Sequence, residues 1–108
     1  MPVIQVEGKN IELDAEGYLV DHEEWNEKIA CILAVIEGVT KSCPLTREQI
    51  KILKFMREYY VKFKAFLIPS AVCKNINLQD KCVISNFLDP VKAWKIAGLP
   101  KAKVLRTR

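Results

Sequence analysis

The chain has few of the residue patterns from which metal centres and small enzymes are built. Its 108 residues include one histidine, His22, and its four cysteines form no Cys-x-x-Cys pair. A structural zinc site needs close pairs of ligands, and common catalytic sites carry a paired acid–base motif or a glycine-rich phosphate loop. None of these motifs occurs in the sequence. We therefore expect no metal, no cofactor and no ordinary enzymatic activity.

Long hydrophobic runs are also missing from the sequence. The apolar stretches fall far short of the roughly 20 residues that a membrane span requires. Residues 1–7 lack the basic region followed by an apolar core that marks a signal peptide. We therefore expect a cytoplasmic protein with no membrane partner.

The cysteines lie 12, 30 and 9 positions apart, at Cys31, Cys43, Cys73 and Cys82. Thiols in a reducing cytosol stay unpaired, so we expect no disulfide. Cys31 falls within an apolar helical pattern, where cysteine behaves as a small buried hydrophobic residue. Cys43 lies in a linker beside Pro44, where it is either an exposed reactive thiol or an incidental loop residue.

What is present is the composition of one globular domain, with 50% apolar and 28% charged residues. Residues 3–7 alternate between apolar and polar side chains, residues 8–10 supply turn chemistry, and residues 11–13 alternate again. This pattern predicts a short β-hairpin. Because a two-stranded hairpin is unstable alone, it must pack on the rest of the fold.

Helix signals fill most of the remaining chain. Asp21 and Glu24 form a capping-box pattern that predicts the start of a first helix, and Gly38 predicts its end. Thr46 and Gln49 repeat the capping-box pattern and predict a long amphipathic helix. That helix covers roughly residues 47–64, with one apolar and one basic face.

Shorter segments follow the long helix. Residues 70–75 and 78–88 predict two short helices, with Ser70 as the cap of the first. Asp89 and Pro90 predict the start of a last helix. Gly98 and Pro100 end it. The fold class is therefore mainly α, a small helical bundle with an N-terminal β-hairpin at residues 1–98 and a basic C-terminal arm at residues 99–108.

Charge is distributed unevenly along the chain. Residues 1–37 hold nine acids and two bases, for a net charge of −7, whereas residues 38–108 hold four acids and fifteen bases, for +11. Arg57 is one of the bases on the long helix. The candidate contacts for an anion or a nucleic acid are Arg47, Lys51, Lys54, Lys62, Lys101, Lys103, Arg106 and Arg108. A basic surface binds nucleic acid through counterion release, but a solvated helix face and a solubilising tail explain the same residues.

The segment Lys95-Ile96-Ala97-Gly98-Leu99-Pro100-Lys101 resembles the C-terminal signature of the DsrC/TusE sulfur-relay family. That family includes the gamma subunit of dissimilatory sulfite reductase. Further resemblance lies in residues 6–9, 14–19, 24–25, 45–49 and 56–60, together with Phe87 and Pro90. The resemblance implies a mostly helical fold whose mobile arm inserts into a sulfite reductase or a sulfurtransferase and delivers a cysteine there. Lys95, Gly98, Leu99, Pro100 and Lys101 are then the residues expected to form the partner-binding arm.

The chain departs from the family pattern at both arm cysteines. The two positions that hold cysteine in many members of the family read Trp94 and Leu105 here. A relay thiolate accepts sulfur as a persulfide and passes it on by exchange, and neither of these side chains carries a thiol.

Three functional hypotheses follow. The first is a non-catalytic or regulatory paralogue that docks to a sulfite reductase or sulfurtransferase without carrying sulfur. The second is a nucleic-acid-binding regulator of sulfur metabolism, with residues 70–75 and 78–88 as a helix-turn-helix-like surface. The third is a sulfur carrier that uses a non-standard cysteine, namely Cys43, Cys73 or Cys82.

Overall fold

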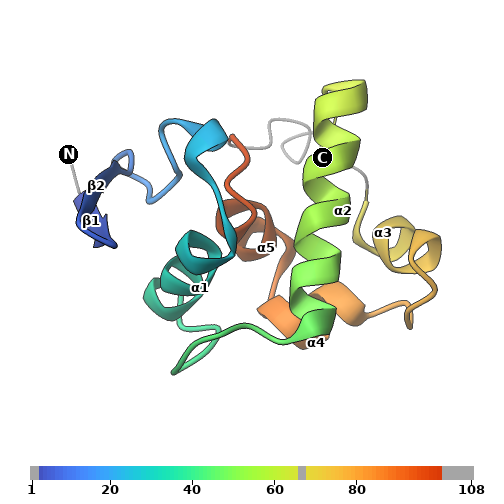
Figure 1. Cartoon of the computed structure of the whole chain (residues 1–108). Helices are drawn as coiled ribbons and strands as arrows, with labels where there is room; N and C mark the ends of the chain where they lie inside the picture. Colours follow the sequence, from blue (N-terminus) through green and yellow to red (C-terminus); the bar gives the residue numbers. More distant parts are fainter. Residues whose placement is uncertain (1–2, 66–67, 101–108) are drawn as a thin grey trace.

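A computed structural model describes residues 3–65 and 68–100 of the chain. A two-stranded sheet leads into a group of helices that surround one core, as Figure 1 shows. The elements are β1 (Val3–Val6), β2 (Lys9–Glu12), the 3-10 helix η1 (His22–Glu24), α1 (Glu27–Ile36), α2 (Arg47–Phe63), α3 (Pro69–Asn75), α4 (Cys82–Phe87) and α5 (Pro90–Ile96). The predicted class, mainly α with an N-terminal hairpin, is confirmed.

The hairpin is tighter than the sequence pattern predicts. Val6 pairs with Lys9, so the turn consists of Glu7 and Gly8 alone. Both turn residues have positive φ, 54° and 81°, as a type I′ hairpin turn requires. Lys9 and Asn10, expected in the turn, belong to β2 instead. Ile11 points into the core and attaches the hairpin to the helices.

The first helix begins later than predicted. Asp21 caps only the short η1, accepting a hydrogen bond from the Glu23 backbone at 3.0 Å. The α1 helix then starts at Glu27, where Asn26 accepts a bond from the Ile29 backbone at 2.9 Å. The sequence offers two competing caps, and the chain uses both in succession. Gly38, with φ of 77°, follows the end of α1 as predicted.

The long helix matches its prediction closely. Thr46 and Gln49 form the capping box reciprocally, with distances of 2.9 and 3.1 Å between their side-chain and backbone atoms. Ile52 and Leu53 are fully buried. Phe63 lies on the apolar face of α2 but is exposed, because α2 extends past the core at its C-terminal end.

The C-terminal helices are shorter than predicted. The α3 helix starts with Pro69 at its first position and has no side-chain cap, so Ser70 does not serve as the predicted cap. The predicted helix over residues 78–88 is reduced to α4. The α5 helix is capped by Asp89, which accepts from the Lys92 backbone at 2.8 Å, as predicted. It packs against α1, α2 and α4, and therefore lies at the centre of the bundle.

All four cysteines form disulfides, so the predicted unpaired state is wrong. Cys31 pairs with Cys43 and Cys73 pairs with Cys82, with Cα–Cα distances of 5.8 Å in both cases. The linker after α1 folds back along that helix, which brings Cys43 to Cys31, and α3 packs on α4, which brings Cys82 to Cys73. Cysteine spacing alone does not reveal these approaches. Across residues 3–65 and 68–100, no helix is long and apolar enough to cross a membrane.

We predict that Phe87→Ala lowers the free energy of unfolding by about 3–5 kcal/mol, because the side chain is 0% exposed and its removal leaves a cavity. Phe63→Ala is the matched control and should cost less than about 1 kcal/mol, since Phe63 is 56% exposed and packs beside Tyr59 on an exposed helix end. Urea unfolding followed by circular dichroism measures both values. Equal losses would contradict this assignment of the core.

Candidate functional site at the base of the C-terminal arm

The chain leaves its last helix through a helix-ending turn that determines where the arm begins. The Gly98 amide donates to the Lys95 carbonyl at 3.0 Å, and the Leu99 amide donates to the Trp94 carbonyl at 3.1 Å. This pair of bonds is a Schellman motif, which needs a left-handed residue after the helix. Gly98 supplies it with φ of 73°. Leu99 then turns back into the core, where it is buried.

Trp25 packs against this turn. Its indole Nε1 donates to the Ile96 carbonyl at 2.9 Å, across 71 positions of sequence. A Cβ atom placed on Gly98 would lie 2.5 Å from Trp25 Cδ1, closer than two such atoms approach. Glycine is therefore required at position 98 for two reasons, namely its backbone conformation and its contact with the indole.

Arg57 joins the turn to the rest of the domain. Its Nη1 donates to the Ala97 carbonyl at 2.8 Å, and its Nη2 donates to the His22 carbonyl at 2.9 Å. The guanidinium also lies 4.6 Å from the centre of the Trp25 ring, within the range of a cation–π contact. Burial lowers the pKa of Arg57, but an arginine stays protonated in proteins and keeps donating.

We call Trp25, Arg57, Gly98 and Leu99 the arm anchor. The two side chains come from α2 and from the residue after η1, so three separated parts of the sequence meet at the arm base. The sequence pattern predicts Arg57 among the bases on the basic face of the long helix. In the structure Arg57 instead binds two backbone carbonyls inside the domain, and no local sequence signal indicates this role.

Several of the predicted arm residues make contacts within the domain itself. Lys95 Nζ lies 3.5 Å from Glu37 Oε2 and 5.0 Å from the centre of the Tyr18 ring, and its side chain is 15% exposed. Gly98 and Leu99 are buried and Pro100 is half-buried. Lys101 lies outside the described residues. Contact of these residues with a partner, and the predicted boundary between domain and arm, stay predictions.

Trp94, predicted to occupy one of the family's arm-cysteine positions, is a core residue. It lies on α5 and is 3% exposed, within the main cluster of buried side chains. The second cysteine position, Leu105, lies outside the described residues. Position 94 therefore contributes packing to this protein and offers no reactive group to a partner.

The basic residues of α2 form no closed anion site. Arg47, Lys51, Lys54 and Lys62 are exposed. Lys54 Nζ pairs with Glu27 Oε2 at 3.0 Å, which offsets part of the positive charge near α1. The other predicted cations, Lys101, Lys103, Arg106 and Arg108, lie beyond the described residues. Nucleic-acid binding through this face and the tail stays a prediction.

We predict that Gly98→Ala destabilises the protein more than Gly38→Ala, by about 1–3 kcal/mol in the free energy of unfolding. The two glycines have similar φ, 73° and 77°, so both variants carry the same left-handed backbone strain. Only position 98 adds an overlap with Trp25, whereas a Cβ on Gly38 meets nothing within 4 Å. Urea unfolding of the two variants gives the difference, and equal costs would contradict the contact with Trp25.

Comparison with protein families identifies the fold's relatives. The family described as DsrC like protein matches residues 5–104 of this chain. The sulfurtransferase TusE of Photorhabdus laumondii is 36% identical over 110 aligned positions, covering 94% of this chain and 96% of that protein. The TusE protein of Escherichia coli K12 is 34% identical over 104 positions, covering 88% and 92%.

Solved structures agree with this assignment. The oxidized gamma subunit of the dissimilatory sulfite reductase, DsrC, from Archaeoglobus fulgidus superposes with a TM-score of 0.79 at 32% identity, covering 94% of this chain and 97% of that chain. DsrC from Allochromatium vinosum superposes with a TM-score of 0.75 at 28% identity, covering 94% and 95%. The chain therefore belongs to the DsrC-like family.

Proposed function

We propose that this protein docks, through its C-terminal arm, to a sulfite reductase or a sulfurtransferase-type partner and does not carry sulfur on that arm. The names of its relatives, sulfurtransferase TusE and gamma subunit of the dissimilatory sulfite reductase, support this kind of partner. The observation that carries the proposal is the contrast between the arm anchor, which is complete, and the arm thiols, which are both replaced. This is a non-enzymatic role.

The anchor supports docking because it fixes the point from which the arm starts. Four hydrogen bonds hold residues 96–99, one from Trp25, one from Arg57 and two within the helix-ending turn, and a cation–π contact joins Arg57 to Trp25. The point at which the arm begins is therefore fixed. A segment that starts from a fixed point loses less conformational freedom on binding than one attached to a mobile base. The basic residues of the tail then favour an acidic entrance on the partner.

The absence of arm thiols supports a role without sulfur carriage. Persulfide formation needs a thiolate that can reach the donor. Trp94 has no sulfur and is packed in the core, and Leu105 has none. The four cysteines that the chain does contain are all paired in the described structure. The protein would then occupy a partner's docking surface and compete there with a cysteine-bearing relative.

We predict that a persulfide donor adds no sulfur to the native protein, because no arm thiolate is present to accept it. Leu105→Cys should gain a mass increase of one sulfur atom, removable by a dithiol, since it restores a thiol at the family's arm position. Intact-protein mass spectrometry measures both outcomes. A sulfur adduct on any cysteine of the native protein would sink this part of the proposal and favour the carrier hypothesis.

We also predict that truncation after Pro100 weakens binding to a sulfite reductase or a TusE-partner sulfurtransferase by about tenfold or more, equivalent to about 1.4 kcal/mol. Surface plasmon resonance with the full chain and the truncated chain gives the ratio. Gly38→Ala serves as a control that leaves the arm intact. Equal affinity of both chains would contradict docking through the arm. Binding of the full chain to duplex DNA, without binding to either protein partner, would favour the nucleic-acid regulator.

A further inference from the structure

The two disulfides lie in different surroundings. Cys73 and Cys82 are both buried, with 0% and 4% of their surface exposed. Cys31 is buried too, but its partner Cys43 is exposed. Cys31 and Cys43 also line a surface hollow of about 540 Å³. The Cys43 end of this bond is therefore the one that an incoming thiolate can approach.

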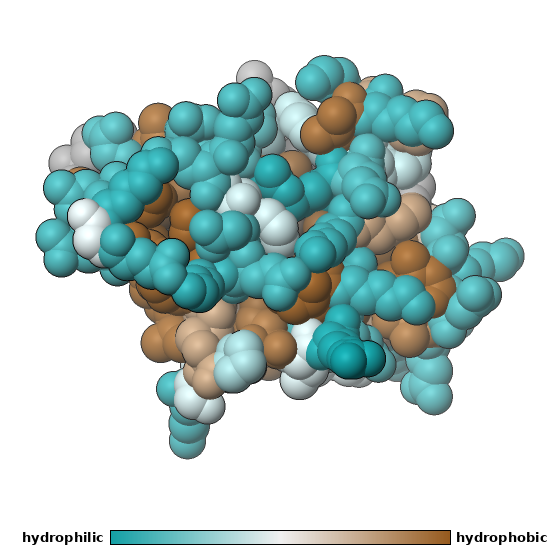
Figure 2. Space-filling model, viewed as in Figure 1, coloured by the Kyte–Doolittle hydropathy of each residue, from teal (hydrophilic) through white to brown (hydrophobic). Residues whose placement is uncertain are grey.

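The hollow beside this disulfide is mainly apolar. Its wall includes Val6 from the hairpin, Ile32 from α1, Leu45 from the linker before α2, and Ile50 from the first turn of α2. Figure 2 shows apolar residues gathered at the surface where α1 lies, below the polar side chains of the hairpin. A volume of this size accommodates a small molecule rather than a peptide chain.

The charged residues that line the hollow all take part in ion pairs. Glu7 pairs with Lys28, and both line the hollow. Glu27, the third charged residue of the lining, pairs with Lys54 at 3.0 Å. Among the described residues that line the hollow, no charged side chain is left unpaired. The hollow therefore favours an uncharged apolar ligand group.

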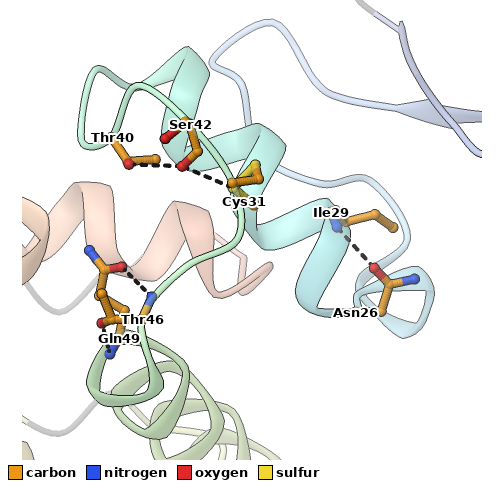
Figure 3. The surroundings of a disulfide bond; sticks show 8 residues. Asn26, Ile29, Cys31, Thr40, Ser42, Thr46 and Gln49 are labelled. Carbon is orange, nitrogen blue, oxygen red and sulfur yellow. Dashed lines mark hydrogen bonds between the residues drawn. A yellow bond between two sulfur atoms is a disulfide. The ribbon is translucent and has the colours of Figure 1, made fainter.

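The reduced form of the pair also fits the surrounding structure. The carbonyl oxygen of Ser42 lies 3.8 Å from Cys31 Sγ, as Figure 3 shows. It is positioned to accept a hydrogen bond from that sulfur once the sulfur carries a proton. A buried cysteine with such a partner is a stable arrangement. Both oxidation states of Cys31 are therefore accommodated without moving α1.

The linker that carries Cys43 is tied down on either side of it. The Val39 amide donates to the Ala34 carbonyl at 2.9 Å, and the capping box fixes Thr46. Opening the disulfide would therefore free Cys43 and Pro44, which line the hollow, while α1 and α2 keep their ends. Exchange at Cys43 would change the wall of the hollow without unfolding the domain.

We propose that the Cys31–Cys43 disulfide is a thiol-exchange site for a small apolar thiol, which binds in the hollow and reacts at Cys43. The thiolate attacks Cys43 Sγ, a new S–S bond forms between the ligand and Cys43, and the Cys31–Cys43 bond breaks. The electron pair leaves on Cys31 Sγ, which takes up the proton that the ligand thiol lost. The step is a disulfide exchange, so it consumes no external oxidant or reductant. Attack by Cys31 on the mixed disulfide reverses it.

The test uses the full-length oxidised protein with benzyl mercaptan and 2-mercaptoethanol, two thiols of comparable pKa that differ in apolar surface. Samples are quenched with acid, alkylated and mapped by peptide mass spectrometry. We expect a mixed disulfide on Cys43, formed about tenfold faster with benzyl mercaptan, while Cys73–Cys82 stays intact. Equal rates for the two thiols, an adduct on Cys73 or Cys82, or no adduct would each overturn the proposal.

A pair of variants tests the role of the hollow. Ile50→Lys places a charge in its wall and should reduce the rate ratio of the two thiols to about one. Val91→Lys adds the same charge on exposed α5 surface and should leave the ratio unchanged. Circular dichroism verifies that each variant is folded.

Cys31→Ser provides a second measurement, since it leaves Cys43 as a free thiol. This thiol should react faster with dibenzyl disulfide than with the disulfide of 2-mercaptoethanol. A lack of preference there would contradict the proposal.

Discussion

The structure depends on one interaction, the double hydrogen bond from Arg57 to the backbone of two distant segments. One nitrogen binds the Ala97 carbonyl and the other binds the His22 carbonyl, while the guanidinium lies against Trp25. A lysine cannot replace this planar fork, because it has one nitrogen and no extended plane. Through Arg57 the long helix holds both the segment that precedes α1 and the turn that follows α5, so the arm base is fixed relative to the whole domain.

This constraint gives the described residues of the family-like segment a role within the domain that does not depend on an arm thiol. Gly98 and Leu99 belong to the anchor, and Lys95 is enclosed between Glu37 and Tyr18. These residues hold the fold together whatever the arm carries. Trp94 adds to the same core. The described residues of the family-like segment therefore support the domain itself.

Much of the fold could be predicted from local patterns, because caps and glycines act over a few residues. The capping box at Thr46 and the Asp89–Pro90 start were predicted correctly for this reason. The anchor could not be predicted, since its bonds cross up to 71 positions and arginine on an amphipathic helix usually faces solvent. The disulfides were missed because the expectation came from the compartment and not from the fold.

Docking without sulfur transfer can be tested in a reconstituted relay. The measurement is the rate at which a cysteine-bearing DsrC-like protein passes sulfur to its partner as this protein is added. We expect the rate to fall with increasing concentration of this protein and to recover when more of the cysteine-bearing relative is added. A partner that receives sulfur when this protein is the sole DsrC-like component would contradict docking without sulfur transfer.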